Sequence, residues 1–134
     1  LVEATLIGHG FTKVETRDVP TLAFAPGAGE FCHESTLGNR KADFIVGLWD
    51  RQVMPVECKV SNSSTNSVKR LNNDTAVKAE TWRNDFGQRN VVPVAVLSGV
   101  YKLHNLLDAQ ERGLSLFWAH DLQRMLDWID GTRG

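Results

Sequence analysis

Three charged residues are spaced so that a β-hairpin would bring them together: Asp43, Glu57 and Lys59. Two largely apolar, strand-like runs, residues 43–48 and 53–60, are separated by a short polar break that is typical of a turn. Because alternate side chains of a strand share a face, Glu57 and Lys59 point the same way, and Asp43 joins them from the first strand. Three charges beside a hydrophobic core are costly unless they pair or hold a metal ion, so this cluster points to chemistry.

The other face of the predicted hairpin is apolar. Its members are Phe44, Val46, Leu48, Met54, Val56, Cys58 and Val60. On this face we expect Cys58 to be a small core residue rather than a nucleophile. The plainest alternative for the charged face is structural, namely an ion pair of Lys59 with Glu57 or Asp43 on an exposed sheet surface.

The charged trio resembles the signature of the PD-(D/E)XK nuclease superfamily. In that superfamily the first Asp and the Glu of Glu-X-Lys bind Mg²⁺, and the Lys assists the attacking water. Ala42 stands where the signature has Pro, but Asp43, Glu57 and Lys59 are all present. Within the superfamily, residues 40–73 are most similar to type II restriction endonucleases of the XamI kind.

This resemblance implies an α/β fold with a restriction-endonuclease-like core, a central mixed sheet of four to five strands flanked by helices. It implies an Mg²⁺-dependent endonuclease that cuts double-stranded DNA at a specific site and leaves 5′-phosphates, with Mn²⁺ as a substitute ion. Asp43 and Glu57 would hold the ion, with the carbonyl oxygen of Cys58 as a further ligand. A homodimer is an expected form.

Two further acidic residues are candidates for an auxiliary catalytic role. Glu3 lies on a predicted helix ahead of the hairpin, where related folds often carry a Glu. Glu34 lies in the segment just before Asp43. We expect at most one of them to join the site, and an ordinary surface carboxylate is the alternative for each.

Polar and basic residues around the hairpin are candidates for contacts with DNA phosphates. They are Arg40, Lys41, Ser61, Asn62, Ser63, Lys69 and Arg70. Lys69 and Arg70 open a predicted helix, where cations oppose the helix dipole, so their position favours phosphate binding over stability. The polar run 61–67 has a second interpretation as a solvated loop that ends in a helix N-cap at Asn66 or Ser67. Lys78 and Arg83, farther along, are interpreted as an ordinary solvated helix face.

The rest of the chain reads as alternating helices and strands around this hairpin. Helices are predicted at 1–7, 68–86, 103–112 and 122–129, and strands at 11–16, 91–97 and 114–118. Residues 91–97 are almost wholly apolar, which predicts a strand buried on both faces. Residues 17–39 are rich in Gly and Pro and are predicted to be mostly loop, with a short strand at 22–25.

The composition sets bounds on these interpretations. The 134 residues suit a single domain, 1–134, and the start at Leu1 without Met leads us to expect a fragment of a longer protein. The net charge of −1 gives no overall basic signal, so DNA binding would depend on a local patch. Two widely spaced cysteines fit a reducing cytoplasm, and no run is long enough to span a membrane.

Two other functions remain open. One is a repair or junction-resolving nuclease with the same fold. The other is a catalytically inactive DNA-binding or interaction module that has kept the fold, although the complete trio argues against lost activity.

Overall fold

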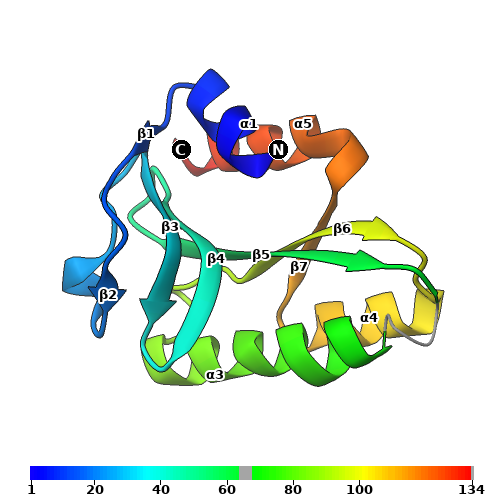
Figure 1. Cartoon of the computed structure of the whole chain (residues 1–134). Coiled ribbons are helices and arrows are strands. Elements are labelled where there is room, and N and C mark those ends of the chain that lie inside the picture. Colours follow the sequence, from blue (N-terminus) through cyan, green and yellow to red (C-terminus); the bar gives the residue numbers. More distant parts are fainter. Residues whose placement is uncertain (64–67, 134) are drawn as a thin grey trace.

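The computed structural model describes residues 1–63 and 68–133. A single mixed sheet lies between two helical layers, with α1 and α5 over one face and α3 and α4 over the other (Figure 1). The helices are α1 (Val2–Gly8), α3 (Ala76–Phe86), α4 (Leu103–Glu111) and α5 (Leu122–Asp130). Among the described residues no helix has the length and apolar character that crossing a bilayer requires.

The sheet runs in the order β1-β3-β4-β5-β6-β7, with β2 also paired to β3. The strands are β1 (Thr12–Lys13), β2 (Asp18–Val19), β3 (Glu30–Leu37), β4 (Arg40–Gly47), β5 (Val53–Ser61), β6 (Val94–Gly99) and β7 (Ser115–Trp118). β4 is antiparallel to both neighbours, whereas β6 is parallel to β5 and β7. The predicted mixed α/β fold is confirmed, and the two-residue strands β1 and β2 extend the sheet beyond the expected number of strands.

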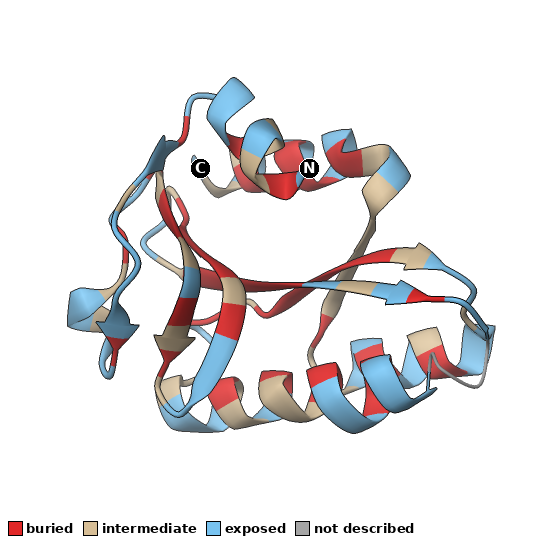
Figure 2. Cartoon of the chain, in the orientation of Figure 1, coloured by how far each residue is buried: buried red, intermediate tan, exposed pale blue. Residues whose placement is uncertain are grey.

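The middle of the sheet is buried on both faces, as the apolar run 91–97 predicts (Figure 2). On β6, Val94 and Val96 pack in the cluster under α1 and α5. Ala95 and Leu97 point the opposite way and pack with α3 and α4. Alternation along a doubly buried strand therefore divides the core into two layers.

The predicted helix 68–86 is present, but its first part has unusual winding. Residues Val68–Thr75 form a π-helical segment, η2, which leads directly into α3. The hydroxyl of Thr75 donates a hydrogen bond of 2.9 Å to the carbonyl oxygen of Arg70, five residues earlier. The buried side chains of η2 and α3 are those of Leu71, Asn72, Thr75, Ala76, Ala79 and Trp82. π-Helical turns are rare and often lie at functional sites.

The sequence-based prediction of secondary structure for the segment 17–39 is wrong. It contains β2 and the eight-residue β3, and residues Leu22–Phe24 form a short 3₁₀ helix rather than a strand. β3 lacks clean apolar alternation, because Phe31 and Cys32 are both buried although they are consecutive. Glu34, in the middle of β3, has a left-handed backbone with φ of 47°, which further disturbs the pattern.

Candidate active site

The candidate site lies where β4 and β5 part. The two strands pair from Phe44 with Val56 to Gly47 with Val53, and no pairing between them continues past Phe44 and Val56. The next residues along the two strands are Asp43 and Glu57. Beyond this point β5 pairs with β6 alone, whereas β4 stays paired with β3. The two strands therefore separate at Asp43 and Glu57, two members of the charged trio.

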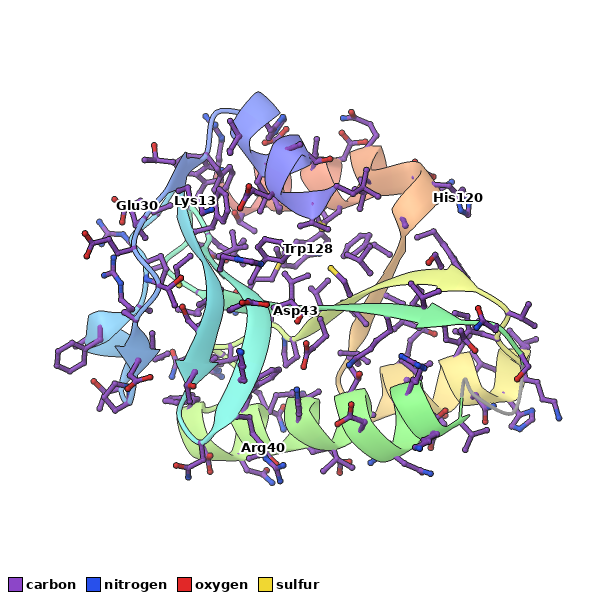
Figure 3. All side chains as sticks on the ribbon, in the orientation of Figure 1. Lys13, Glu30, Arg40, Asp43, His120 and Trp128 are labelled. Atoms are coloured by element: carbon purple, nitrogen blue, oxygen red, sulfur yellow. The ribbon has the colours of Figure 1, made fainter. Side chains whose placement is uncertain are left out.

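Asp43 spans the opening between the two strands. Its Oδ2 accepts a hydrogen bond of 2.7 Å from the backbone N–H of Cys58, a donor on β5 that no longer has a β4 strand partner. Figure 3 shows Asp43 on β4 near the middle of the molecule, at the edge that faces β5. The carboxylate thus substitutes for a missing strand neighbour and is held in place by the backbone.

Glu57 is a buried carboxylate with a lysine partner. Its side chain is 2% exposed, and the Lys78 ammonium on α3 donates a hydrogen bond to its Oε1. Burial raises the pKa of Glu57, the hydrogen bond from Lys78 opposes this rise, and the nearby charge of Asp43 adds to it. The hydrogen bond from the N–H of Cys58, the residue after Glu57, to Asp43 places the two carboxylates near one another.

Lys59 points to the same face of β5 as Glu57, as strand alternation predicts. Its Nζ lies 3.4 Å from Oδ2 of Asp74 on η2. Lys59 and Asp74, together with Lys69 and Arg70, line a pocket of about 300 Å³. Three cationic residues and one acidic residue therefore border this hollow beside the trio, a local basic patch in a chain with a net charge of −1.

The donor set at the opening suits a hard divalent cation. Mg²⁺ prefers oxygen ligands and commonly takes one or two carboxylates, completing its shell with water and substrate oxygens. Asp43 and Glu57 supply two carboxylates from neighbouring strands. Within residues 1–63 and 68–133, no group of three or more Asp, Glu, His or Cys side chains is placed to hold a metal ion. An ion here would thus need further oxygens from water, backbone or substrate.

The two auxiliary glutamates lie in different layers. Glu3 is on α1, over the sheet face opposite α3, and forms an ion pair of 2.8 Å with Lys13 that lowers the pKa of its carboxyl group. Glu34 is exposed on β3, between His33 and Ser35, which pair with Phe44 and Ala42. The register therefore sets Glu34 across from Asp43. Of the two, Glu34 is the better placed.

The polar residues after β5 differ in their accessibility. Ser61 is 1% exposed, and its hydroxyl donates to the carbonyl oxygen of Ser63 at 2.6 Å, so its side chain is committed to holding the turn. Asn62 and Ser63 are exposed. The predicted N-cap at Asn66 or Ser67 lies outside the described residues.

The two basic residues at the start of β4 are also exposed. Arg40 lies at the periphery, near the β3–β4 turn (Figure 3). Lys41 lies nearer the opening, and its backbone carbonyl oxygen accepts a hydrogen bond of 3.0 Å from Nζ of Lys78.

The predicted burial of Cys58 is wrong. Cys58 is exposed, and so is Val60 two residues later, although both share a face with the buried Val56. The alternation of the strand is as expected, but α1 and α5 do not cover this end of the face. Partial desolvation, together with the charges of Asp43 and Glu57, raises the pKa of the Cys58 thiol to about 11, which keeps it protonated and a poor nucleophile.

Lys78 and Asp74 contact the trio, although the sequence pattern does not single them out. The pattern predicts a solvated helix face for Lys78 and no role for Asp74, yet they pair with Glu57 and Lys59 respectively. A signal for Lys78 was present in the sequence. It lies next to Ala79 on the predicted helix, at the border of the buried stripe, where a long side chain can reach across to the sheet.

Two comparisons relate this chain to known proteins. A family model described as XamI restriction endonuclease matches residues 1–118. The type II restriction enzyme XamI of Xanthomonas campestris pv. amaranthicola is 57% identical over 84 residues, which are 63% of this chain and 31% of that enzyme. The chain thus spans about a third of the length of the curated relative it matches. Because the family model matches well over half of the chain, this protein belongs to the XamI restriction endonuclease family.

Proposed function

We propose that this protein is an Mg²⁺-dependent endonuclease that hydrolyses phosphodiester bonds of double-stranded DNA at specific sites. The observation that carries the proposal is the meeting of Asp43, Glu57 and Lys59 at the opening between β4 and β5, beside a basic pocket. Membership of the XamI family and the similarity to a type II restriction enzyme support the same function.

Asp43 and Glu57 would hold the divalent ion in this reaction. A bound Mg²⁺ would lower the pKa of water and offset the negative charge that develops on the phosphate. Asp43 is oriented by the N–H of Cys58, so one of its oxygens is fixed while the other remains for an ion. The carbonyl oxygen of Cys58, in the next peptide group along β5, is proposed as a further ligand of the ion.

Lys59 would act on the attacking water or on the scissile phosphate. Its ammonium has a single acidic partner in the described part of the chain, Asp74, at a long 3.4 Å, so further donors are available for a water or a phosphate oxygen. Attack of the water oxygen on phosphorus would break the bond to the 3′ oxygen and leave a 5′-phosphate. The proton of the water would pass to solvent or to the leaving oxygen.

DNA would lie across the basic pocket that Lys59, Lys69 and Arg70 line. Lys69 and Arg70 are exposed on η2, and Arg40, Lys41, Asn62 and Ser63, the other candidates for phosphate contacts, are exposed as well. A homodimer would offer one such site to each strand of a duplex. We place this activity in the cytoplasm, where reducing conditions suit the free thiols of Cys32 and Cys58.

The test is cleavage of supercoiled plasmid by the wild-type protein and by Lys59→Ala. We expect nicking or linearisation with Mg²⁺ or Mn²⁺, none with EDTA, and binding without efficient cutting with Ca²⁺, which is larger and less demanding in geometry. Lys59→Ala should cut at least roughly a hundredfold more slowly.

Cutting in EDTA at the Mg²⁺ rate would contradict the metal-dependent reaction. DNA binding without any cutting by the wild-type protein would favour the inactive binding module instead. Where the wild-type protein does cut, end-mapping of the products shows whether cleavage is confined to one sequence.

A further inference from the structure

The Lys78 ammonium is held between two oxygen atoms next to the trio. It donates one hydrogen bond to Oε1 of Glu57 and a second, of 3.0 Å, to the carbonyl oxygen of Lys41. The Lys78 side chain is 19% exposed, so it reaches from α3 into the opening rather than into solvent. One cation therefore joins α3, β4 and β5 at the place where β4 and β5 part.

The oxygen atoms around the Lys78 ammonium are of the kind that also bind divalent ions. A carboxylate oxygen and a backbone carbonyl oxygen are common ligands of hard cations in proteins. Glu57 is almost completely buried, and a buried carboxylate without a positive partner is strongly unfavourable. Glu57 thus needs a cation beside it whether or not an ion is bound.

We propose that Lys78 is a positioning residue that holds Glu57 in the ion-free protein and gives way when a divalent ion binds. This inference rests on the proposed ion site at Asp43 and Glu57. A divalent ion and an ammonium repel one another when they share a carboxylate. Lysine suits such an exchange, because its charge is compact and its four-carbon stem is flexible. Lys78 would thereby keep the site assembled and limit its affinity for ions.

The test compares Ca²⁺ binding and thermal stability of the wild-type protein and Lys78→Met at pH 8, without DNA. Methionine keeps much of the length and apolar stem of lysine but removes the charge. We expect calorimetry to show Ca²⁺ binding about tenfold tighter to Lys78→Met, which corresponds to about 1.4 kcal/mol. The variant should have a lower Tm without Ca²⁺, and saturating Ca²⁺ should restore most of that loss.

Lys102→Met serves as the matched control, because Lys102 is exposed at the start of α4 and its removal changes the net charge equally. It should leave both Ca²⁺ affinity and Tm close to those of the wild type. Where Lys78→Met is too unstable to purify, Lys78→Gln removes the charge but keeps a hydrogen-bond donor for Glu57. It should also bind Ca²⁺ more tightly.

Two results would overturn this inference alone: wild-type binding with equal or weaker binding by the Lys78 variants, or a loss of Tm that Ca²⁺ does not restore. The second result would show that Lys78 is merely structural. Failure of both proteins to bind Ca²⁺ or Mn²⁺ would instead overturn the ion site, and the proposed metal-dependent function with it.

Discussion

The two halves of β5 have opposite surroundings, although they belong to one continuous strand. Residues 53–56 are buried and paired with β4, and they supply apolar side chains to the core. Residues 57–61 pair with β6 alone, and exposed positions alternate there with the charged pair Glu57 and Lys59. The departure of β4 makes this difference, because it removes a strand neighbour and leaves a backbone donor for Asp43.

The comparison teaches how a hydrophobic hairpin can present charged groups. The first half of β5 fixes the register through packing, and the register then determines which side chains of the second half face the opening. The charges are tolerated because each has a partner: Cys58 N–H for Asp43, Lys78 for Glu57 and Asp74 for Lys59. The first half of β5 thus contributes to stability, and the second half carries the charged side chains of the candidate site.

Removing core volume from the first half should have the larger effect on stability. Met54 is fully buried, and Met54→Ala should lower the free energy of unfolding by about 2–5 kcal/mol. Val60 points to the same face in the second half and is 58% exposed, so Val60→Ala should change it by less than about 0.5 kcal/mol. Urea denaturation measures both, and equal losses would show that the two halves are packed alike.

Neutralising the basic pocket beside the second half should affect DNA binding without affecting the fold. In the double variant Lys69→Ala/Arg70→Ala, the dependence of log affinity on log salt should fall by roughly one unit for each lost phosphate contact. Affinity should fall similarly for all DNA sequences, because phosphate contacts carry no base information. Fluorescence anisotropy at several salt concentrations measures the affinity and its salt dependence. An unchanged salt dependence would show that Lys69 and Arg70 lie on an ordinary solvated helix face.

The sequence predicted the hairpin and the shared face of Glu57 and Lys59, because strand alternation and the trio are local properties of the chain. It also predicted the doubly buried β6 and the helix that follows the hairpin. β3 escaped prediction because consecutive residues such as Phe31 and Cys32 are buried, and because Glu34 has a left-handed backbone in the middle of the strand.

The partners of the trio could not be predicted in the same way. Strand alternation states which face Cys58 and Val60 belong to, but it cannot state whether a helix covers them. The pairing of Lys78 with Glu57 depends on how α3 is rotated against the sheet, which is a property of tertiary packing. The hydrogen bond from the Ser61 hydroxyl to the carbonyl oxygen of Ser63 likewise depends on the local backbone conformation. The polar composition of residues 61–67 does not specify that conformation.

The most direct test of the proposed ion site is Mn²⁺ binding to the wild-type protein and to Asp43→Asn in the absence of DNA. Asparagine removes the charge of Asp43, but its side-chain oxygen can still accept the hydrogen bond from Cys58 N–H, so Tm should shift by no more than a few degrees. We expect calorimetry to show binding by the wild-type protein that is weakened at least about tenfold in Asp43→Asn. Equal Mn²⁺ affinity of the two proteins would show that Asp43 is not an ion ligand and would contradict the assignment of the site.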